Sequence, residues 1–299
     1  MTALHPHFMV SRQATHRVVI AALAVGVACE RPSPRQDGDV EAPAPEEPSV
    51  RLLLATMWAP SAGYERARPF MDCLDQALRA TSDRALAGGT TLVMRGSYAE
   101  SGALLASGGA DLALVCTGST AYPGLRERFE IAYRLRFADG SSTYRSAVVV
   151  REHDPATSLL DLEGAAVAWV DPDSFTGYRL LRRHLRQQGL DPDSFFGDTT
   201  FTYGHDRAMA AVRDGVTRAA AIDEQTFAGR ESEGLRVLWR SDLYPSPPLL
   251  VTRARPDLKA VLDQVKDRPD CLSDLGAAGL DPAEWSDYDA VGPIVASGE

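Results

Sequence analysis

The sequence predicts an α/β fold in which two α/β units form two lobes around a cleft. Apolar runs of strand length alternate with segments whose apolar residues recur at helical spacing, and this alternation is typical of parallel sheets covered by helices. The chain has 299 residues, of which 44% are hydrophobic and 24% are charged. This is enough to bury one large core or two medium ones.

The two units differ in how the strands and helices follow one another. The first unit is expected to alternate strand, helix, strand, helix and strand, over residues 50–57, 64–80, 89–94, 98–107 and 110–116. The second is expected to contain strands at 144–150, 165–170 and 218–223, with a β-prone run from 199 before a helix that starts at 205. A Pro-rich break at 244–248 precedes a strand at 249–253 and a final helix at 256–265.

Two strand-to-helix junctions between Gly164 and Phe227 carry the most informative polar residues. Ligands of parallel sheets bind at the carboxyl ends of the strands. At the first junction, the hydroxyls of Ser174 and Thr176 and the nearby backbone N–H groups can converge on an oxyanion at a helix N-terminus, and Gly177 lets backbone approach closely. The same run is also typical of an ordinary N-cap.

The second junction places an imidazole and a carboxylate at strand ends. His205 opens a helix, from which the ring can donate a hydrogen bond to an oxyanion in either charge state, or serve only as a surface or capping residue. Asp223 ends an apolar strand, where it can receive an amino group or a hydroxyl of a ligand, or cap a helix or form a hinge salt bridge. Glu224 is a weaker candidate.

The amino terminus is typical of an export signal, predicted over residues 1–28. The apolar run 18–28 follows basic residues and is too short to span a bilayer. It leads to Cys29 in a pattern similar to a bacterial lipobox, which predicts acylation of that cysteine. A signal cut nearby without lipid, or a plain hydrophobic start, remains open. Residues 29–49, rich in Pro and Glu, are expected to be a disordered tether.

Export affects the interpretation of the other cysteines. Cys73, Cys116 and Cys271 form an odd set in an oxidising compartment. Cys73 with Cys271 is the disulfide to test first, because both lie on expected helices of the same lobe. Three buried cysteines without a bond is the alternative.

Charge and composition limit the partners. A formal net charge of -10 gives no support for nucleic acid or an anionic membrane surface as a partner, because both attract clustered Lys and Arg. No cysteine spacing resembles a zinc site, and no metal or organic cofactor is expected.

Several motifs in order carry a family resemblance. The chain resembles the phosphonate-binding proteins of ABC importers, a branch of the two-lobed type II periplasmic binding proteins, in the motifs "SYAESGALLASGGADLALV", "TYRSAVVV", "SLLDLEGAAVAWVDPDSFTGY", "FTYGHDRAMAAVRDG" and "AAAID". The resemblance implies lobe I from 50–143 and 246–299, and lobe II from 144–245. It also implies a monomeric extracytoplasmic protein that passes a phosphonate or phosphite-like anion to an ABC permease. A sensor subunit is the alternative within the binding class, and an enzyme using Cys116, His205 and Asp223 is the competing class.

The resemblance also implies contacts from lobe I and from the start of lobe II. Tyr98 and Tyr144 match tyrosines that face the cleft, although core packing is the alternative for both. Thr117 begins a hydroxyl-rich run after a strand, and the loop 58–61 is a weaker candidate for the rim. Phe175 stands where many family members carry a hydroxyl, so the ligand need not be a phosphonate. Arg95 is expected to replace that attraction or to stay solvated.

Overall fold

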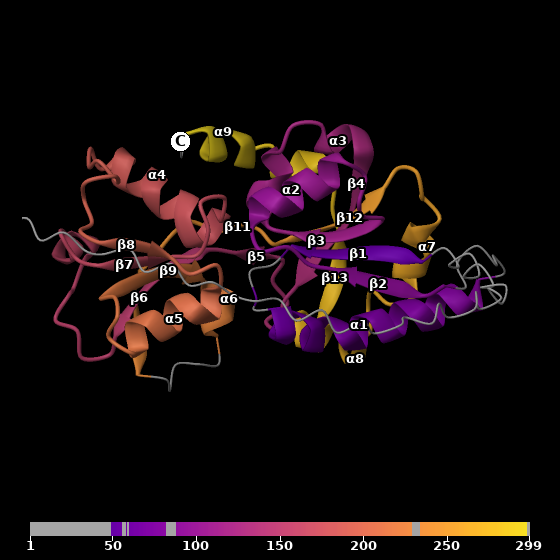
Figure 1. Cartoon of the computed structure of the whole chain (residues 1–299), viewed down its shortest axis with the longest axis horizontal. Helices are drawn as coiled ribbons and strands as arrows, with labels where there is room; N and C mark the ends of the chain where they lie inside the picture. Colours follow the sequence, from indigo (N-terminus) through magenta and orange to yellow (C-terminus); the bar gives the residue numbers. More distant parts are fainter. Residues whose placement is uncertain (1–48, 56–57, 59, 82–87, 229–233, 298–299) are drawn as a thin grey trace, which may run out of the picture. The chain divides into compact units, whose positions relative to one another are not determined.

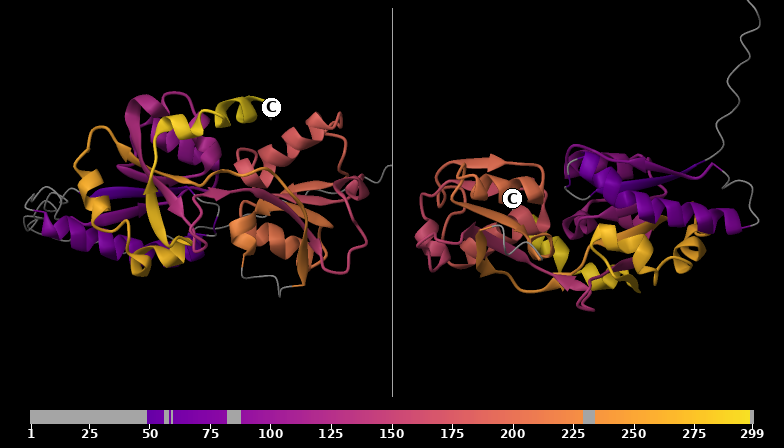
Figure 2. Two further views of the ribbon diagram at one scale, coloured as in Figure 1. Left: turned by 180° about the vertical axis from the view of Figure 1, so that it is seen from behind. Right: turned by 90° about the horizontal axis from the view of Figure 1, so that it is seen from below.

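The described part of the chain forms two large β-sheets, each with helices on both faces (Figure 1; Figure 2), and one small two-stranded sheet. The computed structural model describes residues 49–55, 58, 60–81, 88–228 and 234–297, all of which belong to one compact unit, Pro45–Glu299. The expected signal peptide, Cys29 and nearly all of the tether lie outside these ranges. Within them, no helix is long and apolar enough to cross a bilayer.

The first sheet has the order β13-β4-β12-β3-β1-β2. Its strands are β1 (Val50–Ala55), β2 (Thr90–Val93), β3 (Leu112–Val115), β4 (Phe129–Arg136), β12 (Pro248–Thr252) and β13 (Gly279–Pro282). Strand β1 pairs in parallel with β2 and β3, as expected of a βαβαβ unit. Strand β12 runs antiparallel to β3 and β4, and β13 runs antiparallel to β4, so the sheet is mixed.

Helices and helical turns cover this sheet on both faces (Figure 1). They are α1 (Pro60–Ala80), α2 (Tyr98–Ala106), η2 (Thr117–Ala121), α3 (Leu125–Arg128), α7 (Leu258–Asp263), α8 (Pro269–Leu272), η6 (Ser273–Leu275), η7 (Trp285–Tyr288) and α9 (Val291–Ala296). Helix α2 starts at a Ser97 cap whose side chain accepts a hydrogen bond from Glu100 N, which satisfies one of the free amides of its first turn.

The second sheet has the order β10-β6-β9-β7-β8. Its strands are β6 (Ser146–Arg151), β7 (Val167–Trp169), β8 (Thr199–Phe201), β9 (Ala219–Asp223) and β10 (Leu235–Arg240), and its helical segments are η3 (Leu159–Leu162), η4 (Phe175–Arg179), α4 (Leu180–Gln187), α5 (His205–Arg213) and α6 (Glu224–Phe227). Strands β7, β8 and β9 are parallel, whereas β6 and β10 are antiparallel to their neighbours.

Both faces of the second sheet are buried. Along β6, Ala147 and Val149 pack into one hydrophobic cluster together with α5, while Val148 and Val150 pack into another together with α4. Successive side chains of a strand point to opposite faces, and a strand covered on both faces has no polar side. This explains the unbroken apolar run that predicted the strand.

The strand expected at 144–150 is divided. Tyr144 belongs to β5 (Thr143–Tyr144), which pairs with β11 (Tyr244–Pro245) in a separate two-stranded sheet, and β6 starts only at Ser146. The expectation of one continuous strand was therefore wrong. The Arg145 side chain instead forms an ion pair with Glu224.

The expected last helix is also not the last element. Helix α7 ends at Asp263, and α8, η6, β13, η7 and α9 follow it. These elements are three to six residues long, too short for a helical or strand period to show in the sequence.

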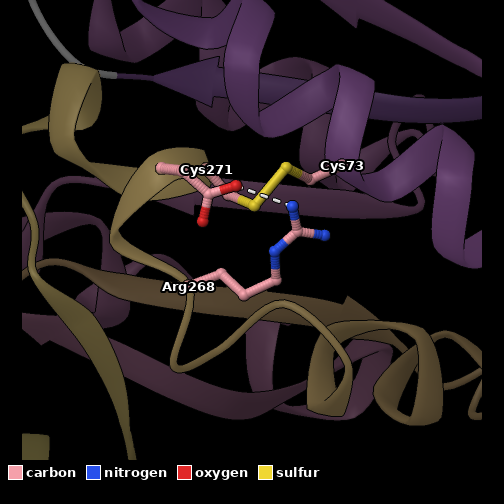
Figure 3. The surroundings of a disulfide bond; sticks show 4 residues. Cys73, Arg268 and Cys271 are labelled. Carbon is pink, nitrogen blue, oxygen red and sulfur yellow. Dashed lines mark hydrogen bonds and ion pairs between the residues drawn. A yellow bond between two sulfur atoms is a disulfide. The ribbon is translucent and has the colours of Figure 1, made fainter.

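A disulfide joins the early and late parts of the chain around the first sheet. Cys73 of α1 and Cys271 of α8 are bonded, with 5.9 Å between their Cα atoms (Figure 3). This is the pair that the sequence put first. The two sulfurs and Asp270 form the single acidic and cysteine cluster of metal-binding size in the described residues, but a disulfide offers no thiolate to a metal.

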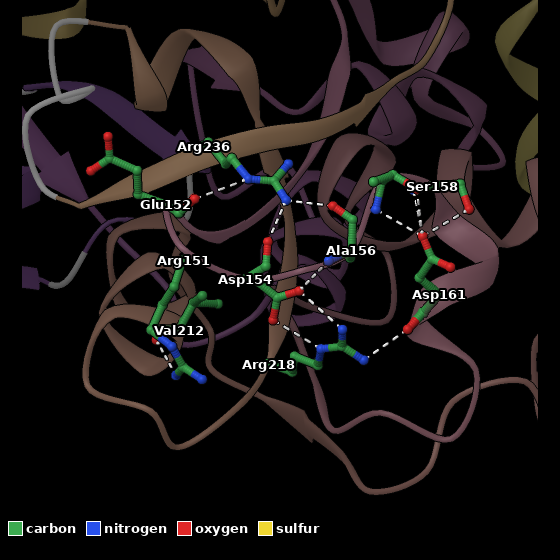
Figure 4. A network of polar contacts seen from close by, with 10 residues as sticks. Arg151, Glu152, Asp154, Ala156, Ser158, Asp161, Val212, Arg218 and Arg236 are labelled. Carbon is green, nitrogen blue, oxygen red and sulfur yellow. Dashed lines mark hydrogen bonds and ion pairs between the residues drawn. The ribbon is translucent and has the colours of Figure 1, made fainter.

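A polar network fixes the connection between β6 and η3 (Figure 4). Arg218 donates to both carboxylate oxygens of Asp154 at 2.9 and 3.0 Å and to Asp161 O. Arg236 donates to Asp154 O and Ala156 O. Such bidentate contacts restrain geometry as well as adding energy, and this loop is thereby held against the sheet away from the junctions considered below.

Candidate ligand-binding site

A cavity of about 250 Å³ lies where the two sheets meet. Five of the residues expected at a site line it: Tyr98, Tyr144, Thr176, His205 and Asp223. Four others that were expected do not line it: Thr117, Ser174, Phe175 and Gly177. The remaining lining residues are Trp58, Arg66, Leu114, Cys116, Leu135, Phe137, Gln225, Thr226, Ala228, Pro247, Leu275 and Gly276.

His205 is held in one tautomer by the neighbouring strand. Its Nδ1 accepts a hydrogen bond from Asp223 N at 3.0 Å, so the neutral ring carries its proton on Nε2. Burial lowers the pKa of His205 to about 4, because a charged ring loses its hydration. The ring at neutral pH is therefore a neutral donor that lines the cavity.

The backbone before His205 is unusual. Tyr203 has φ +50°, a left-handed conformation that a bulky side chain adopts only when its surroundings impose it. Tyr203 N donates to Val170 O at 2.7 Å, and Thr202 Oγ1 donates to both Trp169 O and Gly204 O. These bonds to the end of β7 hold the turn that presents the imidazole.

Asp223 caps α6 and lines the cavity. Its carboxylate accepts hydrogen bonds from Gln225 N at 2.9 Å and from Thr226 Oγ1. Burial raises its pKa to about 7, and within the described chain it has no ion-pair partner. Glu224, by contrast, pairs with Arg145 and Arg240 and does not line the cavity.

The two tyrosines differ in their hydroxyl partners. The Tyr98 hydroxyl bonds to the Cys116 thiol, whereas the buried Tyr144 hydroxyl has the Thr117 side chain as its polar neighbour and makes no well-formed hydrogen bond in the described part of the chain. The neighbouring Thr117 hydroxyl donates to Pro245 O instead. A buried polar group left unpaired costs about 1–3 kcal/mol, so the Tyr144 hydroxyl marks a place where an acceptor from a ligand would be stabilised.

The first junction shows the N-cap that the sequence left open. Ser174 Oγ accepts from Gly177 N at 3.0 Å and is fully buried. A Cβ atom at Gly177 would lie 2.4 Å from Val170 Cγ2, so this glycine is needed for packing within the junction. The cap thereby positions Thr176, whose side chain lines the cavity.

Phe175 is part of the packing between the sheets. Its ring is completely buried and lies edge-on to Tyr244, with 5.1 Å between ring centres. Phe175 also packs close to Gly118: a Cβ atom added at Gly118 would lie 3.2 Å from the Cβ of Phe175. This aromatic contact occupies the position where the sequence resemblance expects a hydroxyl.

Asp171, two residues after the end of β7, was not among the expected site residues. Its buried carboxylate accepts from Tyr98 N at 3.1 Å and from Asp173 N at 2.7 Å. One acidic side chain thus joins the first turn of α2 to the second sheet.

Arg66 was also missed: it lies over the Trp58 ring at 4.9 Å and donates to Asp274 O. Arg95, in contrast, is exposed and donates to Met94 O.

The residues weighed as a catalytic set have other partners. Hydrogen bonds to the Cys116 sulfur come from Tyr98 and from the backbone of Phe175 and Gly118. Burial raises the thiol pKa, which opposes formation of the reactive thiolate. The His205 Nδ1 already accepts a hydrogen bond from Asp223 N, so this nitrogen is not free to act as a base.

Comparisons with known proteins agree with the predicted fold. Residues 54–288 match the family described as "ABC transporter, phosphonate, periplasmic substrate-binding protein". The binding protein component of an ABC phosphonate transporter from Pseudomonas aeruginosa has a TM-score of 0.73 at 16% identity, covering 84% of this chain and 87% of that chain. PhnD1 from Prochlorococcus marinus, solved in complex with methylphosphonate, has a TM-score of 0.72 at 16% identity, covering 84% and 98%.

A third solved structure extends the likeness to another oxyanion class. The periplasmic aliphatic sulphonate binding protein SsuA from Escherichia coli has a TM-score of 0.50 at 17% identity, covering 85% of this chain and 83% of that chain. At such identities the structural likeness concerns the fold. The predicted α/β fold of the type II binding proteins is confirmed.

Proposed function

Because the chain belongs to the family of periplasmic substrate-binding proteins of phosphonate ABC transporters, we propose that it captures a phosphonate or phosphite-like anion in the cavity and delivers it to a permease. Membership of this family implies an extracytoplasmic location and work with an ABC transporter. Lobe I is proposed to comprise 50–143 and 246–299, and lobe II 144–245. The strands of the two sheets fall within these segments.

The cavity composition is the observation that carries the proposal. Neutral donors line one space: the Nε2–H of His205, the hydroxyl of Tyr144 and the Thr176 side chain. Preorganised hydrogen-bond donors bind an oxyanion without needing a fixed positive charge. The unpartnered Tyr144 hydroxyl supports a ligand acceptor at that point.

Closure of the lobes over the ligand is supported by contacts between the sheets. Tyr98 N bonds to Asp171, and the Tyr122 hydroxyl donates to Asp173 at 3.4 Å. A ligand that contacts both lobes favours the closed state by its differential affinity for it. We infer that binding, rather than catalysis, is the role of this constellation.

Calorimetric titration of the purified protein tests the proposal. Methylphosphonate and phosphite are expected to bind, and His205→Ala should weaken binding at least tenfold by removing a donor to a charged group. Glu224→Gln is the matched control, because Glu224 lies beside the site without lining it. If neither anion bound to the folded protein, the proposed ligand class would be refuted. If His205→Ala bound with unchanged affinity, this site would be refuted.

A separate proposal concerns the amino terminus. We propose that Cys29 is acylated and that residues 29–49 tether the domain to the membrane. The support is the sequence pattern alone, since these residues, apart from the last, precede the described part. Cys29→Ala should move the protein from the membrane fraction to the soluble fraction of cells, and unchanged fractionation would refute the anchor.

A further inference from the structure

The cavity has two chemically different sides. Tyr144, Thr176, His205 and Asp223 make a polar side with β5 and the second sheet's helices. The first sheet and its connections contribute five apolar residues, which we call the apolar wall, beside Trp58, Arg66, Tyr98, Cys116 and Gly276. It consists of Leu114, Leu135, Phe137, Pro247 and Leu275.

The apolar wall offers a ligand few polar contacts. Its leucines and phenylalanine are 2–5% exposed. The backbone at its centre is already paired: Leu135 N donates to Pro247 O, and Leu135 O accepts from the Ser246 hydroxyl. Proline has no N–H to donate. A polar or charged group placed here would lose its hydration without compensation.

Two charged residues line the cavity in the described part of the chain, and neither belongs to the apolar wall. Asp223 belongs to the polar side, and Arg66 lies over the Trp58 ring while donating to Asp274 O. At about 250 Å³, the cavity has room for about eight groups of the size of a water molecule, at ~30 Å³ each. This is more than a phosphonate group with a methyl substituent fills.

We propose that the ligand is an anion with a short apolar substituent, of about propyl or butyl size, that lies along the apolar wall while the oxyanion binds the polar side. This deepens the proposed function and rests on it for the head group. Burial of each further methylene against the wall is worth about 0.8 kcal/mol, which corresponds to a fourfold gain in affinity.

A series of alkylphosphonates tests the proposal by calorimetry on the purified protein. Methyl-, propyl- and butylphosphonate should bind with affinities that rise about fourfold per methylene, and the heat-capacity change should become more negative along the series. 3-Hydroxypropylphosphonate, similar in length to the butyl compound, should bind more weakly than it. A flat series, or equal binding of the hydroxyl compound, would overturn the proposal.

Two variants locate the effect. Leu275→Ala should reduce the advantage of butyl- over methylphosphonate at least threefold. Leu272→Ala is the matched control, because Leu272 is a comparably buried leucine of the same segment that does not line the cavity. If the two variants had equal effects on the alkylphosphonate affinities, the substituent would lie elsewhere and the proposed role of the apolar wall would be refuted.

Matched alkylsulfonates and alkylcarboxylates separate the two proposals. If no phosphonate binds but one of these series shows the gain per methylene, the phosphonate function fails while the apolar wall is supported. If phosphonates bind without any dependence on chain length, the function stands and the wall is refuted. If no series binds or shows a gain, the inference is refuted as well.

Discussion

Asp223→Asn is expected to stabilise the protein above neutral pH. Burial raises the folded-state pKa of Asp223 to about 7 from an ordinary 3.8. Between these values the unfolded state releases a proton that the folded state keeps, so stability falls as pH rises from about 4 to 7. A difference of about three in pKa, at about 1.4 kcal/mol each, corresponds to about 4 kcal/mol.

The asparagine keeps the structural role of the side chain and removes only the ionisation. Its amide oxygen can still accept from Gln225 N, as Asp223 does at 2.9 Å, while the new NH2 group needs an acceptor and offsets about 1–2 kcal/mol of the gain. We therefore expect a net stabilisation of about 2–3 kcal/mol at pH 8 and a net loss of about 1–2 kcal/mol at pH 4.

Urea unfolding of the ligand-free protein at pH 4 and pH 8 measures this difference. Glu224→Gln is the control of opposite sign. Against the effect of burial, Arg145 and Arg240 lower the pKa of the Glu224 carboxyl, so loss of this negative charge should destabilise the protein at pH 8. If Asp223→Asn changed stability equally at both pH values, or lowered it at pH 8, the reasoning from the buried carboxyl would be wrong.

Three further changes have expected outcomes. Tyr144→Phe removes an unpartnered buried hydroxyl and should stabilise the ligand-free protein by about 1 kcal/mol while weakening anion binding; a loss of stability with unchanged affinity would contradict this. His205 has its pKa lowered to about 4, so its ionisation alone should lower stability by about 3 kcal/mol as pH drops from 6.5 to 4, which opposes the gain from Asp223 over the same range. In urea titrations, His205→Asn should therefore raise stability at pH 4 relative to pH 6.5 by about 3 kcal/mol, and an unchanged difference would contradict this. Replacing Cys73 and Cys271 by Ser opens a link across 198 positions and should cost up to about 5 kcal/mol, and a cost below about 1 kcal/mol would show that the unfolded chain is already constrained.

The sequence predicted the fold where patterns are long and failed where elements are short. The buried run of β6 was visible because both faces of its sheet are covered. Strand β13 and helix α9, four and six residues long, are held by contacts with distant segments and have no period of their own. Strand β4 was omitted although apolar residues recur along it, with Glu130 exposed between buried neighbours.

The candidate site was predictable in its polar residues and not in its apolar ones. Strand ends and helix starts pointed to Thr176, His205 and Asp223, all of which line the cavity, and whether they contact a ligand stays a prediction. The apolar wall gave no signal, because a leucine that lines a cavity is indistinguishable in sequence from one in the core. Ser174 shows the reverse case, in which a hydroxyl typical of an anion site is used by the backbone.

The position of Cys116 makes the labelling rate of its thiol a measure of opening in this protein. Cys116 is 5% exposed, and its sulfur receives backbone hydrogen bonds from Gly118 of one segment and Phe175 of the other. Cys116 also lines the cavity, so a thiol reagent must enter the cavity to reach it, and the rate of labelling reports how often the cavity is open to solvent. A bound ligand should slow the labelling of Cys116 in proportion to the fraction of time that the protein spends closed. The native cysteine is sufficient for this measurement.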